Sequence, residues 1–430
     1  MSDQSAHIAE PQPPMIEDHT APRSLSGLLG AIGFVLSVLW VCKQPMARDH
    51  RILICLAATA GPMILFDLLW LRVHRRPSAG IHQAPGAIRW DNVALKSAGL
   101  LLTIGAVAAA YGIFKEYHGA FYNPFWGLLR HIALPFAALT VPYIAWTDAR
   151  MANPRDGYWH VGAAVLGPLL GVSRDEVDRG EIYKHARAWL VKAFFWPLMI
   201  VYLSQNLTSV ALKMRTWQSV DSFTRFYDLA WLGMYTVDVG FAAVGYAMTF
   251  RLFDAQTRSA EPTLIGWGLC LMCYQPFWGV AGKMYLSYDD GHSWGHWLLD
   301  QPLIHNIWGS SILLLTFIYM WATVTFGLRF SNLTHRGILT FGPYRWLRHP
   351  AYVSKNLSWW LVTIPFIPTS GWTEALRACS ALLLVNVVYA ARAWTEERHL
   401  GMDAAYRAYQ QQTPWVGERA RRWLAREDAT

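Results

Sequence analysis

Charged residues are scarce in this chain. Only 15% of its 430 residues are Asp, Glu, Lys or Arg, whereas 53% are hydrophobic. Soluble globular domains carry about a quarter charged residues, so this composition excludes an ordinary soluble protein. Runs of roughly twenty apolar residues, the length that crosses the hydrocarbon core of a bilayer, recur along most of the chain. The composition therefore predicts an integral membrane protein.

Cysteine is also rare, with five residues in the whole chain. This content excludes the dense disulfide framework of small secreted domains. Cys270 and Cys273 form a Cys-x-x-Cys pair, but they lie inside an apolar run with no second pair of ligands nearby. We interpret them as small apolar residues of the helix packing, with a metal or redox role as the alternative.

Neither a cleavable signal peptide nor a clear internal repeat is visible. The first 24 residues are polar and contain four prolines, so residues 1–24 are predicted to form a disordered tail. An inverted-repeat transporter would show broken spans at corresponding places in two halves. The sequence has no such pair, which argues against that class of transporter.

Apolar stretches predict about ten transmembrane helices. They lie near residues 25–42, 52–71, 93–114, 131–147, 186–208, 226–250, 263–281, 304–326, 351–368 and 374–391. The predicted fold is an all-α polytopic membrane protein that ends in a helical hairpin and a cytoplasmic tail helix. We predict an N-terminal membrane region of about eight helices over 25–326 and a polar C-terminal region over 327–430.

The positive charge is concentrated in particular loops. Loops 72–92 and 327–350 each carry four arginines, whereas loop 282–303 carries three aspartates and one lysine. The positive-inside rule then predicts that both termini are cytoplasmic, although the basic loop 43–51 disagrees with this topology. Because these loops explain the net charge of +8, no nucleic-acid partner is expected. The expected location is the bacterial inner membrane.

Residues 342–356, GPYRWLRHPAYVSKN, interrupt the apolar pattern near the C-terminus. Pro350 suits the first turn of a helix and places His349 at the helix entrance. Tyr352 and Asn356 then fall on the same helical face as His349. With Arg348 beside it, this helix entrance would attract a carboxylate or a phosphate.

A second polar cluster follows the predicted hairpin. Arg392, Glu396 and His399 share one helical face, and the adjacent Glu396 and Glu397 would be costly at a bilayer edge unless paired or solvated. Each feature alone has a structural explanation, such as a surface ion pair worth under about 1 kcal/mol. If the hairpin closes, however, the two clusters meet and together offer cations and carboxylates to a zwitterionic ligand.

The residues of these clusters resemble those of the isoprenylcysteine carboxyl methyltransferases and related phospholipid methyltransferases. That family carries an Arg-His-Pro-x-Tyr segment and, after a helical hairpin, a Glu-Glu pair and a Tyr-x-x-Tyr stretch. This chain has Arg348-His349-Pro350-Ala351-Tyr352, then Glu396-Glu397, then Tyr406-Arg407-Ala408-Tyr409. The resemblance covers about residues 327–415, so the C-terminal region is expected to be methyltransferase-like.

The resemblance implies S-adenosyl-L-methionine as the methyl donor and a lipidic or amphiphilic acceptor reached among the membrane lipids. It places Arg392 near the acceptor. We predict Arg392 and Asn356 as the catalytic residues, although many members of the family have a smaller residue at the position of Asn356. It implies that Glu396 or Glu397 binds the amino group of the donor. The remaining residues expected to line the cofactor pocket are Gly342, Pro343, Tyr344, Arg348, His349 and Tyr352.

Three alternatives stay open. A membrane reductase of the sterol-reductase type would use NADPH in place of S-adenosylmethionine. A lipid-binding or transport protein could carry the same motif without enzymatic activity. His292 and His296 have a spacing that could bind a metal ion, but they lie in a loop predicted on the other side of the membrane, where an interfacial loop is the preferred interpretation.

Overall fold

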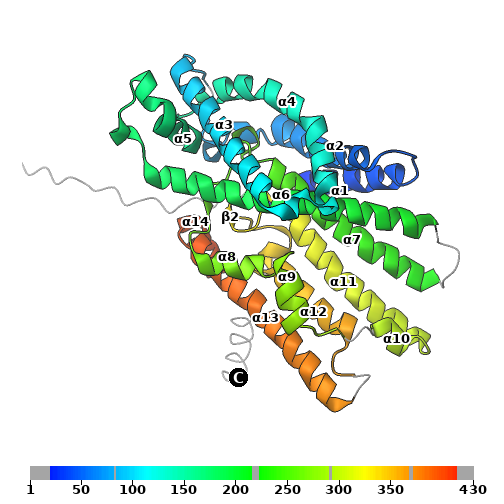
Figure 1. Cartoon of the computed structure of the whole chain (residues 1–430). Helices are drawn as coiled ribbons and strands as arrows, with labels where there is room; N and C mark the ends of the chain where they lie inside the picture. Colours follow the sequence, from blue (N-terminus) through cyan, green and yellow to red (C-terminus); the bar gives the residue numbers. More distant parts are fainter. Residues whose placement is uncertain (1–19, 82–83, 216–221, 290–292, 368–370, 414–430) are drawn as a thin grey trace, which may run out of the picture.

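Long α-helices make up almost all of the secondary structure (Figure 1). The computed structural model describes residues 20–81, 84–215, 222–289, 293–367 and 371–413. Most of the predicted disordered tail and the end of the predicted tail helix lie outside these residues. The first seven helices are α1 (Thr20–Val41), α2 (Arg48–Leu65), α3 (Trp90–Ile113), α4 (Asn123–Asp148), α5 (Gly157–Leu166), α6 (Arg179–Arg215) and α7 (Ser222–Ala247).

The second half of the chain alternates short and long helices. They are α8 (Leu264–Leu271), α9 (Phe277–Val280), α10 (Trp294–Leu298), α11 (Pro302–Phe326), α12 (Pro350–Thr363), α13 (Trp372–Leu400) and α14 (Ala404–Gln412). Two short strands, β1 (Ser259–Ala260) and β2 (Thr334–His335), pair antiparallel with Ser259 opposite His335. Since α1 begins at Thr20, the last residues of the predicted disordered tail are helical.

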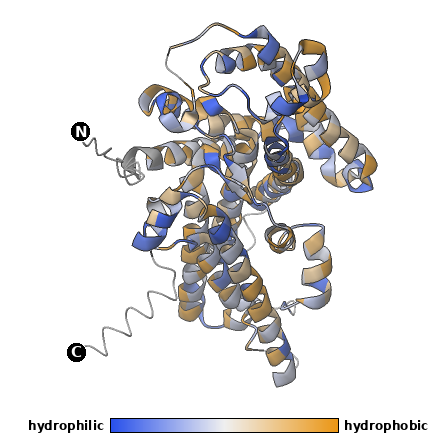
Figure 2. Ribbon diagram, turned by 90° about the vertical axis from the view of Figure 1, so that its left-hand side faces the viewer, coloured by the Kyte–Doolittle hydropathy of each residue, from blue (hydrophilic) through white to orange (hydrophobic). Residues whose placement is uncertain are grey.

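Among the described residues, seven helical segments are long and apolar enough to cross a membrane, which supports an all-α polytopic membrane protein. They are Ser24–Val41, Arg48–Trp70, Trp90–Ile113, Ala120–Asp148, Arg179–Arg215, Pro302–Arg329 and Trp372–Leu400. Each of them contains or overlaps one of the ten predicted spans. Hydrophobic residues dominate these helices in Figure 2.

The other three predicted spans differ from the expectation. Segment 226–250 lies mostly in α7, which is long enough but is not apolar enough, because Asp238, tyrosines and glycines interrupt its apolar residues. Segment 263–281 breaks into α8, a turn and α9. Segment 351–368 contains only the 14 residues of α12, about 21 Å of helix, which is shorter than a hydrocarbon core of roughly 30 Å.

The N-terminal helices form the largest apolar core. α1 packs against α2, α6 packs against α7, and α3 crosses α5 at closely approaching glycines. Side chains such as Phe34, Ile52, Phe195 and Phe241 are almost completely buried between these helices. This core supports the C-terminal elements, because α11 packs against both α7 and α1.

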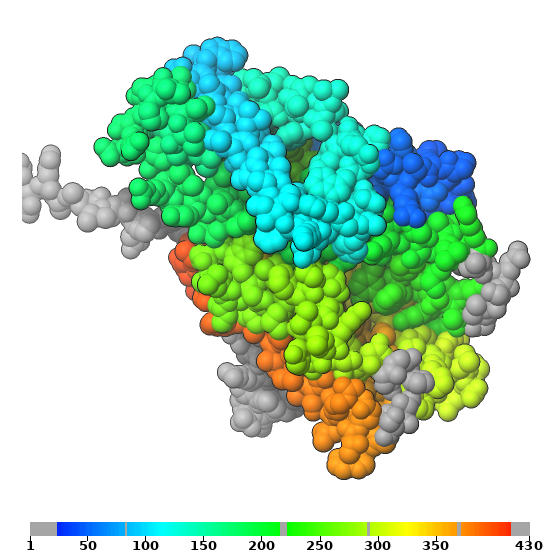
Figure 3. Space-filling model, in the orientation of Figure 1, coloured from blue at the N-terminus to red at the C-terminus, as the bar shows by residue number. Residues whose placement is uncertain are grey.

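The C-terminal helices wrap one side of this core. α12 packs along α11, and α13 packs against α12 and α8. Figure 3 shows α8 and the residues after it covering the upper part of α13. The predicted hairpin is therefore present, although its first helix is short and residues 368–370 of its turn lie outside the described residues.

A buried arginine fixes the loop that leads into the hairpin. The Arg336 guanidinium donates hydrogen bonds to five backbone carbonyls, those of Gly245, Met248, Ala255, Leu328 and Phe330. Some of these carbonyls stand at the C-terminal end of α7, where a cation is favoured by the helix dipole. The loop is thus held against the N-terminal core at the level where the two polar clusters lie.

Candidate functional site

The entrance of α12 is built by a glycine turn and a proline. Gly342 has φ +60°, and a Cβ atom at this position would lie 2.8 Å from the Thr325 hydroxyl of α11. Only glycine allows this close approach at a positive φ. A one-turn helix over Gly342–Arg345 follows, and α12 then begins at Pro350, with His349 outside the helical conformation at φ −128° and ψ 59°. The sequence thus positions His349 at the helix entrance, as predicted.

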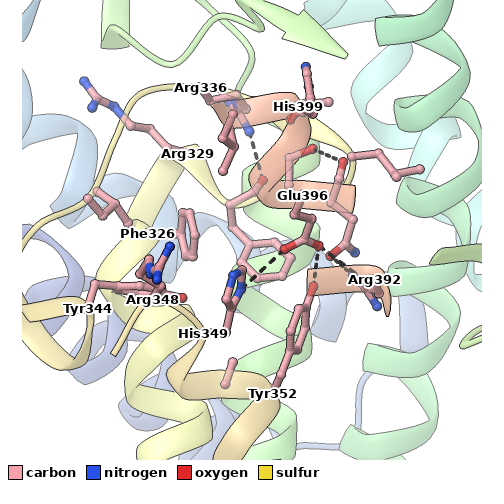
Figure 4. Close-up of a pocket in the computed structure, with 18 of the residues that line it drawn as sticks. Phe326, Arg329, Arg336, Tyr344, Arg348, His349, Tyr352, Arg392, Glu396 and His399 are labelled. Atoms are coloured by element: carbon pink, nitrogen blue, oxygen red, sulfur yellow. Dashed lines mark hydrogen bonds and ion pairs between the residues drawn. The ribbon is translucent and has the colours of Figure 1, made fainter. Parts of the chain in front are cut away.

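The second cluster approaches from the C-terminal third of α13. Tyr352 donates a hydrogen bond to Glu396 Oε1, and Arg392 Nε donates to the same oxygen at 3.3 Å. His349 Nε2 lies 3.0 Å from Glu397 Oε1. Figure 4 shows Tyr352, Arg392 and Glu396 pointing toward one another from α12 and α13. The predicted meeting of the two clusters is confirmed.

A cavity of about 170 Å³ lies where these side chains converge. This volume is enough for roughly ten water molecules. Six of the ten predicted site residues line it, namely Tyr344, Arg348, His349, Tyr352, Arg392 and Glu396. The others, Gly342, Pro343, Asn356 and Glu397, are outside the lining. The cavity wall also includes residues before position 327, so the site belongs to both predicted regions of the chain.

The two adjacent glutamates have different partners. Glu397 binds Arg348 Nη1 at 2.9 Å, His349 Nε2 at 3.0 Å and the Gln410 amide at 3.2 Å. Glu396 receives its hydrogen bonds on Oε1, whereas its Oε2 makes none in the described structure and lies 3.9 Å from His349 Nδ1. A carboxylate accepts several hydrogen bonds, so Glu396 is the glutamate that can still bind a ligand cation.

Arg392 is fixed at the centre of the site. Its side chain is 3% exposed, and its Nη2 donates to Asn332 Oδ1 at 2.7 Å. Its guanidinium also lies over the rings of Tyr274, Tyr352 and Tyr389. Stacked and hydrogen-bonded arginines of this kind keep a fixed orientation, so Arg392 presents a constant positive charge to the cavity.

Asn356 is engaged between helices. Its Nδ2 donates to the Tyr352 carbonyl at 2.7 Å, and its Oδ1 accepts from Asn386 Nδ2 at 2.8 Å. Asn386 in turn accepts from Trp360 Nε1 at 2.8 Å. These hydrogen bonds connect α12 with α13, so the position of Asn356, which was predicted to be catalytic, favours a structural contribution.

Lys355 belongs to the cavity although the sequence did not single it out as a site residue. Its ammonium lies 4.9 Å from the centre of the Tyr319 ring, 5.5 Å from that of Trp359 and 6.0 Å from that of Tyr389. Tyr319 in turn donates to Asp238 Oδ2 at 2.7 Å. A lysine inside an apolar segment is the signal that could have identified it, because such residues usually face a cavity or a partner.

Asn332 is a second residue whose role depends on distant partners. Its side-chain amide donates to the Tyr246 hydroxyl at 2.7 Å and to the Tyr274 hydroxyl at 3.0 Å, and its carbonyl accepts from Arg392. Asn332 lies in the segment that precedes the Arg-His-Pro motif and was not predicted as a site residue. Its neighbours come from α7 and from the segment after α8, so sequence spacing alone could not place them together.

The Tyr-x-x-Tyr stretch closes the cavity from α14. Tyr406 and Tyr409 are buried in its lining, and the Tyr409 hydroxyl donates to the Tyr344 carbonyl at 2.7 Å. Burial raises the pKa of Tyr344, Tyr406 and Tyr409 above the ordinary tyrosine value. These hydroxyls therefore stay protonated and act as hydrogen-bond donors at neutral pH.

The possible histidine metal pair is only half described. His296 lies in α10 with its ring against Trp297, whereas His292 lies outside the described residues. The alternative of a metal site in this loop stays a prediction.

Comparison with known proteins adds one match. Residues 301–413 match the model of a family described as a protein of unknown function (DUF1295). This segment includes α11, both polar clusters and the Tyr-x-x-Tyr stretch. No curated protein and no solved structure matches the chain.

Proposed function

We propose that this protein is a membrane methyltransferase that uses S-adenosyl-L-methionine to methylate a lipidic or amphiphilic acceptor. The observation that carries the proposal is the convergence of α12 and α13 on one cavity, where Glu396 keeps a carboxylate oxygen without a hydrogen bond beside cationic side chains. A small zwitterion with an additional positive charge needs partners of both signs when it is removed from water. The cavity lining offers both.

The residues fit this methyl donor as follows. Glu396 Oε2 would accept the ammonium group, because its other oxygen is already used by Tyr352 and Arg392. Arg348 and His349, at the entrance of α12, would face the carboxylate. When bound, S-adenosylmethionine supplies a methyl group activated on a sulfonium. Aromatic rings stabilise such cations, and several tyrosines line the same cavity.

The protein's contribution to methyl transfer would be positioning and exclusion of water. In-line transfer depends mainly on alignment of the two reactants, and the hydrogen-bonded Arg392–Glu396 pair provides a fixed frame for it. Glu397 holds His349 and Arg348 in place from outside the cavity lining. No general base is required in the bond-forming step when the acceptor is already deprotonated or carries a lone pair.

The wall toward the membrane interior supports an amphiphilic acceptor. Tyr319 lies about two turns before the end of α11, and Lys355 lies more than one turn inside α12. Apolar residues such as Phe326, Ile338 and Leu339 complete the lining. A lipid chain could be accommodated along such a wall, while the reacting headgroup would lie near Arg392.

Binding of labelled S-adenosylmethionine to the purified protein tests the proposal. We expect Glu396→Gln to weaken binding at least about tenfold, because a charged hydrogen-bond acceptor is lost, and His349→Ala to weaken it as well. Glu374→Gln is the matched control, since Glu374 lies at the opposite end of α13 and pairs with the exposed Arg377. This control should bind like the natural protein.

The same preparation distinguishes the alternatives. Incubation with labelled S-adenosylmethionine and a membrane lipid extract should yield labelled lipid, whereas NADPH should not bind. Binding of NADPH without S-adenosylmethionine would support a sterol-reductase-like enzyme instead. Binding of neither would leave a lipid-binding or transport protein and would refute the proposal.

A further inference from the structure

A second cavity lies at the end of the helix bundle away from the candidate site. Gly27, near the start of α1, touches the Val324 carbonyl at the end of α11, where the candidate site lies. α1 is 22 residues long, about 33 Å, and its far end leads into the start of α2. The second cavity is lined by the starts of α2 and α4 and by α6, and its volume is about 730 Å³. The two cavities therefore face opposite sides of the membrane.

The lining of this second cavity is positively charged. Arg48 and Arg130 both contribute to it, and neither guanidinium has a hydrogen bond or an ion pair in the described structure. Two long helices, α2 and α4, also begin at the cavity. Free N–H groups and the helix dipole make such ends favourable for anions.

Neutral polar groups of α6 complete the wall. Ser204 is only 6% exposed, yet its hydroxyl has no hydrogen-bond partner among the described residues. The side chains of Gln205 and Ser209 line the cavity with no partner there either. A buried polar group without a partner is costly, so Ser204 favours a polar ligand, and the exposed Gln205 and Ser209 offer further polar groups beside it on the same helix.

One carboxylate also lines the cavity. Asp49 Oδ2 lies 2.7 Å from His131 Nε2, and Asp49 Oδ1 lies 3.6 Å from His50 Nδ1. The Asp49 carboxylate keeps its negative charge when these imidazoles are neutral, but the two guanidiniums outnumber it, so the charged side chains of the lining are net positive. Asp49, His50 and His131 could in principle hold a metal ion, but the adjacent arginines disfavour a cation.

We infer that this second cavity binds a phosphate-bearing anion at the membrane face opposite to the candidate site. Arginine matches phosphate because its planar group donates two parallel hydrogen bonds, and Ser204, Gln205 and Ser209 supply further donors. Phosphate chemistry of this kind occurs both in anionic lipid headgroups and in free phosphate. The cavity is lined by the ends of candidate membrane-spanning helices, at the level expected for lipid headgroups. The experiment therefore tests an anionic lipid first and free phosphate second.

The experiment uses the full-length protein in nanodiscs of phosphatidylcholine with a minor fraction of phosphatidylglycerol. The protein is then released from the nanodiscs with detergent. Native mass spectrometry measures how much of each lipid stays bound to the released protein. The natural protein should retain phosphatidylglycerol over phosphatidylcholine. The double variant Arg48→Gln/Arg130→Gln should lose this retention about tenfold, while its thermal unfolding temperature stays unchanged because neither guanidinium has a partner.

Two controls isolate the cavity. Arg51→Gln removes a charge one turn along α2 from Arg48, but Arg51 binds the Gln44 carbonyl at 3.0 Å and does not line the cavity, so retention should persist. Thr208→Trp fills the cavity without changing charge and should abolish retention. Leu212→Trp places the same side chain one turn further along α6, outside the lining, and should not.

Inorganic phosphate distinguishes the source of the anion. Displacement of phosphatidylglycerol by inorganic phosphate would show that the cavity also accepts the free anion, and failure to displace it would restrict the ligand to a lipid headgroup. Equal retention of both lipids by the natural protein without phosphate binding would overturn the inference. So would retention of phosphatidylglycerol by the double variant at the level of the natural protein.

Discussion

Glu396 and Glu397 are neighbours in the sequence but differ in what surrounds them. Glu397 binds Arg348, His349 and Gln410 and lies outside the cavity lining. Glu396 lines the cavity, and its Oε2 makes no hydrogen bond in the described structure. On one helix, a step of about 100° between consecutive residues separates a residue that positions the site from one that can contact a ligand.

Replacement of Asn356 tests whether it acts in catalysis or in helix packing. Asn356→Ala leaves the Asn386 amide without its acceptor, so we expect a loss of about 1 kcal/mol of stability. The affinity for S-adenosylmethionine should stay within about twofold of the natural value. Thermal unfolding and labelled-ligand binding measure the two quantities. Unchanged stability together with abolished methyl transfer would instead support the predicted catalytic role of Asn356.

His335 predicts a pH dependence of stability. Burial lowers its pKa from 6.5 to about 4, although Asp403 beside it acts in the opposite direction. The folded protein therefore keeps this imidazole neutral, whereas the unfolded chain binds a proton below about pH 6.5. The stabilisation is fully present above pH 6.5 and is lost as the pH falls toward 4, by up to about 3 kcal/mol.

Thermal unfolding of the detergent-solubilised protein at pH 7.5, 6 and 5 checks this dependence. Carboxylates also titrate toward the acidic end of this range, so the comparison is made with His335→Gln, which lacks the titrating group. The difference in unfolding temperature between the two proteins should change as the pH falls. Parallel curves would show that His335 does not contribute.

At the scale of elements, hydropathy identified the long helices but not their interruptions. Segment 263–281 is continuous in hydropathy, yet the chain turns after α8 and runs on through Pro276. α12 ends at Thr363, because Ile364 adopts a left-handed conformation with φ +43°. Such conformations depend on tertiary packing, and Ile364 is almost completely buried, so a hydropathy window could not predict this end.

The crossing of α3 and α5 depends on the absence of side chains at one point. A Cβ atom at Gly99 would lie 1.9 Å from the Tyr158 carbonyl oxygen, whereas Gly105 on the same helix has open space around it. Gly99→Ala must separate the two helices, so we expect a loss of roughly 1–3 kcal/mol. Gly105→Ala is the matched control and should be neutral or slightly stabilising.

The unfolding temperatures of the two alanine variants are compared, with size-exclusion chromatography used to monitor the loss of folded protein on heating. If Gly99→Ala unfolds at the same temperature as the natural protein, α3 and α5 do not cross as closely as the structure places them.

At the scale of the whole molecule, the two ends of α1 lie at opposite faces of the helix bundle. Lys43 is exposed just beyond its end, and Arg407 is exposed on α14 beside the candidate site. Single cysteines at these positions, in a variant without the native cysteines, should react with a membrane-impermeant maleimide from opposite sides of sealed vesicles. The positive-inside rule predicts that Arg407→Cys reacts from the cytoplasm. Reaction of both cysteines from the same side would contradict the arrangement.

The sequence predicted the central part of the candidate site because its residues are grouped in short motifs. Helical periodicity placed His349 with Tyr352 and Arg392 with Glu396, and the hairpin brought the pairs together. Lys355 and Asn332 were not assigned to the site, because their partners lie on α7, on α11 and after α8. Contacts between residues distant in the sequence depend on how whole helices dock, which local patterns do not encode.

The cavity wall combines residues from both predicted regions of the chain, and this bears on how the cavity can be altered. Tyr274 and Tyr319 lie before the motif-bearing region, yet they share the wall with Tyr352 and Arg392. Substitutions in the earlier helices can therefore reshape the space offered to an incoming molecule while the charged residues after them stay unaltered. Under the proposed function, chimeras that exchange residues 25–326 between related chains should accordingly inherit their acceptor preference from the exchanged part.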